Sequence, residues 1–217
     1  SNPTPNSVTD YQDAAADPAK VDQKKYNWLE YYKLKFKADW YTKVLGTPKS
    51  PLVLRSLIEF GFLGAYNQDR GVIPFERFFL GGDGMANYSM DGRETVALRG
   101  YPNGSLTPVA NDSQDSNGAT IYNKFSLELR YPITLKASAS IYALTFLEAG
   151  SSFDTFKNYN PFALSRSAGV GLRVFMPAFG LLGIDFGYGF DGLPLPNGLL
   201  RPQANGWETH FIIGQQF

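Results

Sequence analysis

Residues 121–132 read Ile-Tyr-Asn-Lys-Phe-Ser-Leu-Glu-Leu-Arg-Tyr-Pro, and from Lys124 onward polar and apolar side chains alternate without a break. Successive side chains of a β-strand point to opposite faces, so this pattern predicts a strand with one apolar and one polar face. The polar face carries Glu128. Pro132 lies where a proline is tolerated, at a strand end, and we expect it to close the strand.

A second stretch upstream of this strand is Leu98-Arg99-Gly100-Tyr101, within the Gly-rich residues 66–120, which show no sustained period. A connection this long is normally functional or disordered. An arginine buried without a partner costs several kcal/mol, and its planar fork suits carboxylates. We therefore expect an otherwise irregular loop that folds back into a β-barrel and pins Arg99 to acidic residues on the inner wall.

Six further segments show the same period of two. They lie at about residues 29–40, 52–62, 137–151, 165–176, 181–190 and 207–217, which with 121–132 makes seven predicted antiparallel strands. Several are longer than the roughly five or six residues of a common globular strand, and they suit the roughly 9–11 residues of a tilted strand that spans a bilayer.

The composition fits an outer-membrane barrel. The 217 residues include 17 Phe, 13 Tyr and 22 Gly but no Cys, which excludes disulfides and thiolate metal sites. The 20 basic residues balance the 20 acidic ones, so there is no basic excess for binding nucleic acid. We find no apolar run long enough for a transmembrane helix and no signal-peptide pattern.

The lengths of the connections favour a barrel over a soluble sandwich. Short joins follow the first, third and fifth predicted strands, and longer ones follow the second, fourth and sixth, as in outer-membrane barrels. Seven strands leave two open edges, which lipid does not tolerate. We therefore expect residues 29–217 to be the C-terminal part of a larger barrel, completed by another chain or a segment not included, with residues 1–28 an external loop or tail.

From about Tyr26 onward the chain resembles the BamA/FhaC/TpsB superfamily of outer-membrane assembly and translocation barrels, and within it the BamA type. Leu98-Arg99-Gly100-Tyr101 matches the V/I-R-G-F/Y signature at the tip of the family's longest external loop. Other matching motifs, in family order, are residues 30–33, 74–82, 126–132, 146–150 and 167–171, followed by the terminal strand.

The resemblance implies an all-β antiparallel transmembrane barrel of about 16 strands, of which this chain holds the last seven, with the loop 66–120 inside the lumen. It implies a structural loop lock in which Arg99, with Gly100 and Tyr101, pairs with Glu128 and Glu148. The family's usual second acid is Asp, so we expect Glu148 to lengthen or loosen its contact. Loss of Arg99 would then strand Glu128.

The resemblance also implies a function. It indicates the central subunit of the machinery that folds and inserts β-barrel proteins into the bacterial outer membrane through a lateral seam. The terminal strand would form that seam with the first strand of the barrel, through Trp207, Phe211, Gly214 and Phe217. No enzymatic activity, cofactor or metal is implied. The implied partners are the remaining N-terminal barrel strands and POTRA domains, accessory assembly lipoproteins, unfolded outer-membrane protein clients and the lipid bilayer, without nucleic acid.

Three other functions stay open. A two-partner secretion transporter of the same superfamily would export an unfolded client, and the number of upstream POTRA domains would distinguish it. A passive porin would need an open lumen. An outer-membrane enzyme would need partners for His210, the only histidine, which we expect to face the lumen or lie at its rim. Arg173 and Asp185, on inward faces of adjacent predicted strands, are expected to form an ion pair or to be solvated.

Overall fold

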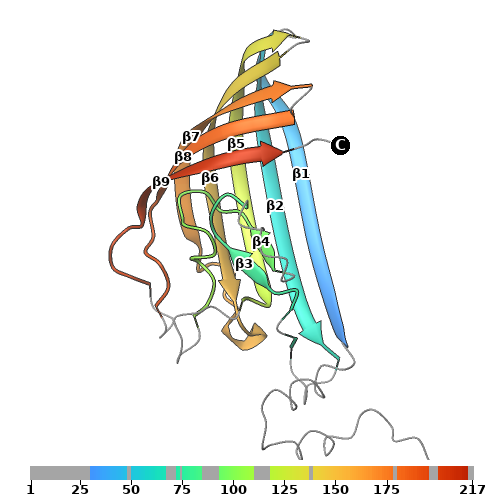
Figure 1. The fold of residues 1–217 in the computed structure, drawn as a ribbon, viewed down its shortest axis with the longest axis vertical. Coiled ribbons are helices and arrows are strands. Elements are labelled where there is room, and N and C mark those ends of the chain that lie inside the picture. Colours follow the sequence, from blue (N-terminus) through green and yellow to red (C-terminus); the bar gives the residue numbers. More distant parts are fainter. Residues whose placement is uncertain are drawn as a thin grey trace, which may run out of the picture.

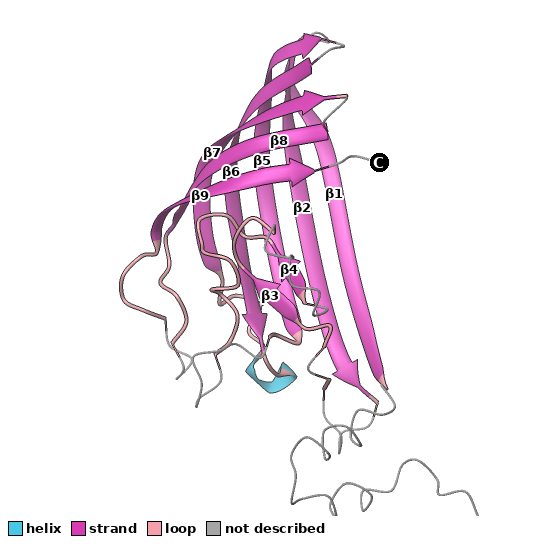
Figure 2. Cartoon of the chain, in the orientation of Figure 1, coloured by secondary structure: helices cyan, strands magenta, loops and turns pink. Residues whose placement is uncertain are grey.

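The computed structural model describes residues 30–47, 50–66, 72–73, 75–84, 93–109, 118–136, 139–177, 180–195 and 200–214. Strands dominate these ranges, and their single helical element is the short 3-10 helix η1 (Phe156–Asn158) (Figure 2). Among the described residues no helix has the length and apolar character needed to cross a membrane. The predicted tail 1–28 and the seam residue Phe217 lie outside the described residues.

Seven strands form one antiparallel sheet in the order β1-β2-β5-β6-β7-β8-β9 (Figure 1). Their bounds are β1 (Tyr31–Thr47), β2 (Ser50–Ala65), β5 (Ile121–Lys136), β6 (Ala139–Phe153), β7 (Ser165–Met176), β8 (Gly180–Gly189) and β9 (Gly206–Gly214). Every strand pairs with the next one in this order, and β1 and β9 are the two edges of the described sheet. The prediction of an all-β antiparallel fold is confirmed.

The strand that contains Pro132 runs further than the sequence predicts. The pairing of β5 with β6 shifts register between Pro132 and Thr134 and then continues to Lys136. Pro132 is still a register partner of Tyr142, and Ile133 is the residue left out of the ladder. The pairing of β5 with β2 ends at Arg130, so at Pro132 one side of β5 has no strand partner in the described sheet, and a proline without an N–H is tolerated at such an edge. The prediction that Pro132 closes the strand is therefore wrong.

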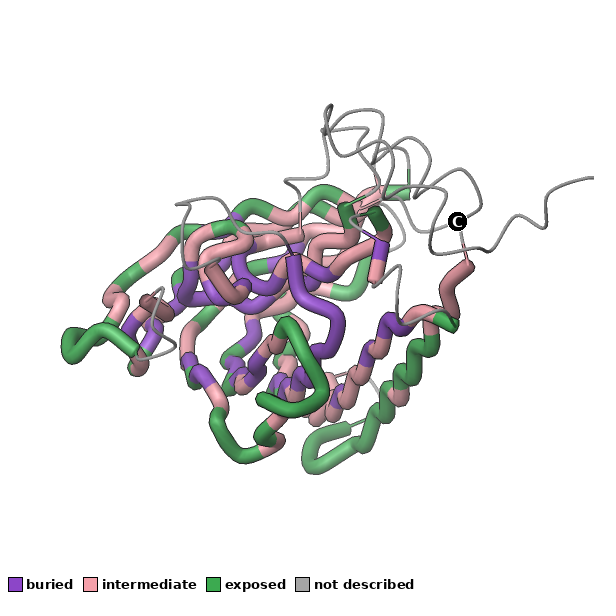
Figure 3. The backbone as a smooth tube through the Cα atoms, turned by 90° about the horizontal axis from the view of Figure 1, so that it is seen from below, coloured by how far each residue is buried: buried purple, intermediate pink, exposed green. Residues whose placement is uncertain are grey.

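The sheet is curved, and its two faces differ in chemistry. Figure 3, seen along the length of the sheet, shows the buried segments gathered on its concave side. The convex face carries exposed apolar side chains on β1 and on β5 to β9, for example Phe36, Leu127, Leu147, Val170 and Phe211. The concave face carries charged side chains, which is the arrangement of a membrane barrel wall.

The long connection between β2 and β5 is more ordered than the sequence predicts. It contains β3 (Phe78–Leu80) and β4 (Glu94–Val96), which pair in parallel and lie on the concave side of the sheet (Figure 1). The prediction of an otherwise irregular loop is wrong because strands of three residues are too short to show a period. Apolar loop side chains pack against the wall in one core cluster: Leu63, Phe78, Leu80, Val96, Leu98, Tyr101, Leu106, Ala119 and Tyr122.

Candidate functional site: the loop lock

Arg99 is 5% exposed and binds three carboxylates on three different strands. Its Nη2 donates to Glu128 Oε1 on β5 and to Glu148 Oε1 on β6, at 2.6 Å each. Its Nη1 donates to Asp185 Oδ2 on β8 at 3.0 Å. Burial alone would lower the pKa of Arg99, but the adjoining carboxylates, Glu148 first, outweigh burial and raise the pKa, so the guanidinium stays charged.

Glu148 holds the loop by its backbone as well as by its side chain. Its Oε2 accepts the backbone N–H of Arg99 at 2.8 Å, and its Oε1 also accepts Ser126 Oγ at 3.0 Å. The expectation that a glutamate here would lengthen the contact is wrong, since Nη2 of Arg99 is as close to Glu148 as to Glu128. The ring of Phe146 lies 3.8 Å from the guanidinium carbon and adds a cation–π contact.

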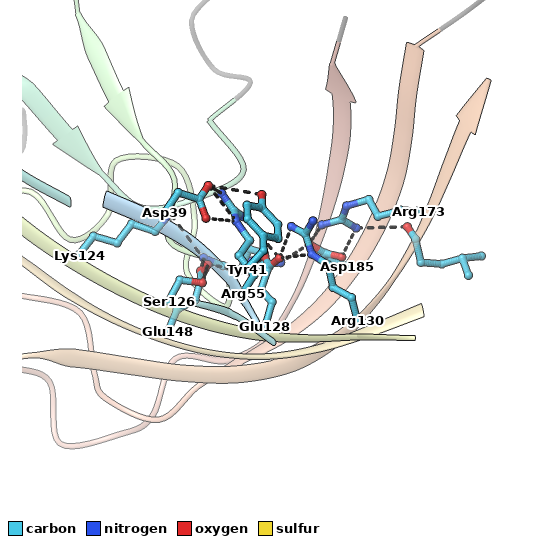
Figure 4. A network of polar contacts seen from close by, with 12 residues as sticks. Asp39, Tyr41, Arg55, Lys124, Ser126, Glu128, Arg130, Glu148, Arg173 and Asp185 are labelled. Atoms are coloured by element: carbon cyan, nitrogen blue, oxygen red, sulfur yellow. Dashed lines mark hydrogen bonds and ion pairs between the residues drawn. The ribbon is translucent and has the colours of Figure 1, made fainter. Parts of the chain in front are cut away.

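Further arginines share the same carboxylates (Figure 4). Glu128 also accepts Arg130 Nη2 at 2.5 Å and lies 3.4 Å from Arg55 Nη1. Arg55 in turn bonds to Asp39 on β1 at 2.8 Å. At the other end, Asp185 accepts Arg173 Nη2 at 2.6 Å. The result is a continuous charged network that runs from β1 through the loop to β8. Arg173 and Asp185 were expected either to form an ion pair or to be solvated, and the structure shows the ion pair.

The loop tip comes close to the backbone of β8 at two glycines. Gly100 has a φ of 86°, a conformation that side chains disfavour. A Cβ added to Gly187 on β8 would lie 2.6 Å from the nitrogen of Gly100, and one added to Gly189 would lie 2.5 Å from its oxygen. Glycine at these two positions of β8 is therefore what lets the loop backbone approach the sheet.

The tip also binds the end of the sheet. His210 on β9 is buried, and its Nε2 accepts the N–H of Gly100 at 2.8 Å. Asn205 donates its Nδ2 to the oxygen of Gly100 at 2.9 Å. Tyr101 is fully buried and donates its hydroxyl to the oxygen of Arg166 at 2.7 Å. Burial raises the pKa of Tyr101 to about 12, so this phenol remains a donor at any physiological pH.

A second set of contacts holds the loop at the opposite edge of the sheet. Lys33 on β1 bonds to Glu76 at 2.8 Å and to Glu94 on β4 at 2.6 Å, and Lys35 bonds to Glu94 at 2.9 Å. Burial would raise the pKa of Glu94, but the two lysines outweigh it and lower the pKa. The loop thus spans the concave face, with ionic contacts on β1 and hydrogen bonds on β9.

The charged network borders a cavity of about 470 Å³ that is lined by Arg99, Glu128, Glu148 and several lysines and arginines of the wall. The described residues contain no cluster of His, Cys, Asp or Glu suited to a metal ion. The carboxylates here are bound to cationic side chains. The arrangement can hold a loop in place, because the side chains that border it form ion pairs between the loop and the wall.

The structure brings together all five residues of the predicted loop lock: Arg99, Gly100, Tyr101, Glu128 and Glu148. Of the predicted seam residues, Trp207 and Phe211 point outward from β9 and are 69% and 57% exposed, and Gly214 is the last residue of that strand. Sequence reasoning placed His210 only at the lumen or its rim and did not link Asp185 to Arg99. The sequence pattern could place His210 and Asp185 on inward faces of their strands. It could not show that the two residues are register partners across β8 and β9.

A curved antiparallel sheet with an apolar convex face, a charged concave face and a loop fixed inside by a buried arginine defines a section of a transmembrane β-barrel wall with an occupied lumen. Residues 16–217 match the model of the Omp85 superfamily domain, and the chain belongs to this superfamily. The family predicted from the sequence motifs is confirmed.

Among solved structures, the chain is similar to BamA from Haemophilus ducreyi lacking POTRA domains 1–3, with a TM-score of 0.56 and 18% sequence identity. The similarity covers 84% of this chain and 35% of that structure, so the chain spans about a third of its length. At this identity the likeness concerns the fold. No curated protein sequence matches the chain.

Proposed function

We propose that this chain is the C-terminal part of a BamA-type barrel in the bacterial outer membrane, which folds and inserts other β-barrel proteins through a seam at β9. The observation that carries the proposal is the steady shortening of the wall toward that strand. From β1 to β8 the strands contain 17, 16, 16, 15, 12 and 10 residues, and the described part of β9 contains nine.

The shortening has a consequence for the bilayer. At about 3.4 Å per residue and a tilt of about 40°, the ten residues of β8 rise only about 26 Å, and the seventeen of β1 rise about 44 Å. The apolar band of an outer-membrane barrel is about 25 Å tall, so β8 barely covers it. A wall this short is accommodated by local thinning of the bilayer, which lowers the barrier to insertion of a new strand beside it.

Insertion of a client strand also requires backbone hydrogen-bonding groups that are free to pair, and the edge of β9 provides them. Within the described residues β9 pairs only with β8, so one row of its backbone donors and acceptors faces away from the sheet. Such an edge can pair with a strand of an incoming client by β-augmentation. The charged network and the loop hold the wall in place while the free edge of β9 exchanges partners.

The partners we propose are the remaining N-terminal strands and POTRA domains, assembly lipoproteins, unfolded outer-membrane protein clients and lipid. We propose no enzymatic role. In support, the acceptor nitrogen of His210 is already bound to the backbone of Gly100. Secretion of a client through the lumen, the function of a two-partner transporter, is less well supported because β3, β4 and the loop tip lie inside the curve of the sheet and would have to leave it (Figure 1).

The test is reconstitution of the whole protein that contains this chain into liposomes, followed by addition of an unfolded outer-membrane barrel as client. We expect the client to become embedded in the bilayer and heat-modifiable faster than in liposomes without the protein. Release of the client into the liposome lumen would support the transporter instead. An unchanged folding rate, with no release, would refute both functions.

A further inference from the structure

The terminal strand has a second attachment to the protein besides its pairing with β8. The peptide groups on either side of Gly100 are bound by side chains from this end of the chain: its N–H by His210 Nε2 at 2.8 Å and its oxygen by Asn205 Nδ2 at 2.9 Å. His210 lies on β9, and Asn205 directly precedes that strand. We call these two residues the Gly100 clamp.

The clamp joins the loop lock to the edge strand at one point. Asp185 and His210 are register partners across β8 and β9. Asp185 binds the side chain of Arg99, and His210 binds the backbone of the next residue, Gly100. Two adjacent loop residues therefore hold two directly opposed positions of neighbouring strands. Since an acceptor nitrogen is unprotonated, His210 is neutral with its proton on Nδ1.

We infer that the Gly100 clamp makes the loop a brace for the edge strand: docking of Arg99 in the carboxylates of the wall stabilises β9 through His210 and Asn205. The inference rests on the proposed function, because it assigns control of the seam to the loop. β9 pairs through nine register partners with β8 alone in the described sheet, so a contact of one or two hydrogen bonds is a substantial part of what retains it.

The test uses the whole protein in lipid nanodiscs and measures hydrogen exchange in peptides that cover residues 98–102 and 206–214. His210→Phe keeps a ring of similar size but leaves the N–H of Gly100 without an acceptor. We expect exchange in both segments to rise roughly 10-fold, as for a buried donor that loses its partner. His210→Gln, whose oxygen can take the place of Nε2, should restore most of the protection.

The matched control is Thr209→Val, which changes the neighbouring exposed residue of the same strand without altering the clamp. It should leave both segments unchanged. If His210→Phe does not assemble, Asn205→Ala removes the other half of the clamp at a position before the strand. Faster exchange in residues 98–102 with no change in residues 206–214, in either variant, would overturn the inference.

Coupling is tested by combining variants. Arg99→Ala should raise exchange in residues 206–214 of the native protein and should add little when His210→Phe and Asn205→Ala are already present. Fully additive effects would show that the loop lock and the edge strand are independent, and would also overturn the inference. Client insertion is measured separately. Normal insertion of the client, without coupling between the loop lock and β9, refutes the Gly100 clamp alone. Coupling between the loop lock and β9, without insertion of the client, refutes the proposed function alone.

Discussion

Replacing Arg99 by alanine leaves the three carboxylates in unequal positions. Glu128 keeps Arg55 and Arg130, and Asp185 keeps Arg173. Glu148 keeps Ser126, the backbone N–H of residue 99 and Lys124, whose Nζ is 3.9 Å away. The sequence-based expectation that Glu128 would be stranded is therefore wrong, and Glu148 is the carboxylate left with no cationic atom closer than 3.9 Å.

The expected loss in the free energy of unfolding follows from the contacts that remain. Removing one partner of a buried ion pair costs about 3–5 kcal/mol. We expect the lower end, about 3 kcal/mol, because the adjoining cavity of about 470 Å³ can admit water to Glu148. The corresponding change in the unfolding equilibrium is roughly 100-fold.

The assay is denaturant unfolding of the whole barrel in detergent micelles, with heat-modifiability as a second readout. Adding Glu148→Gln to Arg99→Ala should recover part of the loss, whereas adding Glu128→Gln should not. The charge swap Arg99→Glu with Glu128→Arg should also fail, because it sets the new arginine beside Arg130. Wild-type stability of Arg99→Ala, or rescue by the charge swap, would refute the reasoning.

Other variants probe the loop contacts one at a time. Gly187→Val should displace the loop tip and lower the free energy of unfolding by about 1–3 kcal/mol in the same assay. Gly214→Ala should change the free energy of unfolding by no more than about 0.5 kcal/mol, because an added Cβ has open space there. Equal effects of the two variants would contradict the close approach of the loop tip to β8. Tyr101→Phe removes a hydroxyl that donates to the oxygen of Arg166 and accepts the N–H of Asp191, and it should cost about 1–3 kcal/mol through loss of these two hydrogen bonds; no loss would show that the hydroxyl is not bound. The two lysines of β1 hold the pKa of Glu94 below its ordinary value of 4.5, so the stabilisation it provides is complete above that value and is lost as the pH falls below it. Glu94→Gln should therefore flatten the loss of loop protection, measured by hydrogen exchange, on going from about pH 5 to about pH 3; an unchanged acid profile would contradict the contact.

Much of the wall could be predicted because a strand between lipid and a polar lumen must alternate strictly. That constraint placed all seven strands and the inward faces of Glu128 and Glu148. It failed at Pro132, where the strand continues past a register shift, and in the loop, where β3 and β4 are stabilised by packing against the wall. No local pattern encodes those contacts.

The loop lock was also predictable only in part. Arg99 and its two glutamates could be predicted from the sequence motifs. The roles of Asp185 and His210 depend on the register of β8 against β7 and β9, which only the structure shows. The glycines at positions 187 and 189 were visible as a small-residue face, but their purpose depends on the backbone of Gly100 lying against them. Contacts between a long loop and distant strands are set by tertiary packing, which periodicity does not describe.

The guanidinium of Arg99, on the long loop, is held inside the curve of the wall by carboxylates from three strands. The most direct measurement is a cryo-electron microscopy map of the whole protein in lipid nanodiscs. We expect density for Arg99 within hydrogen-bond distance of Glu128, Glu148 and Asp185, with Gly100 against His210. A map with residues 98–101 outside the barrel and Glu148 bound only to Ser126 and Lys124 would contradict this arrangement.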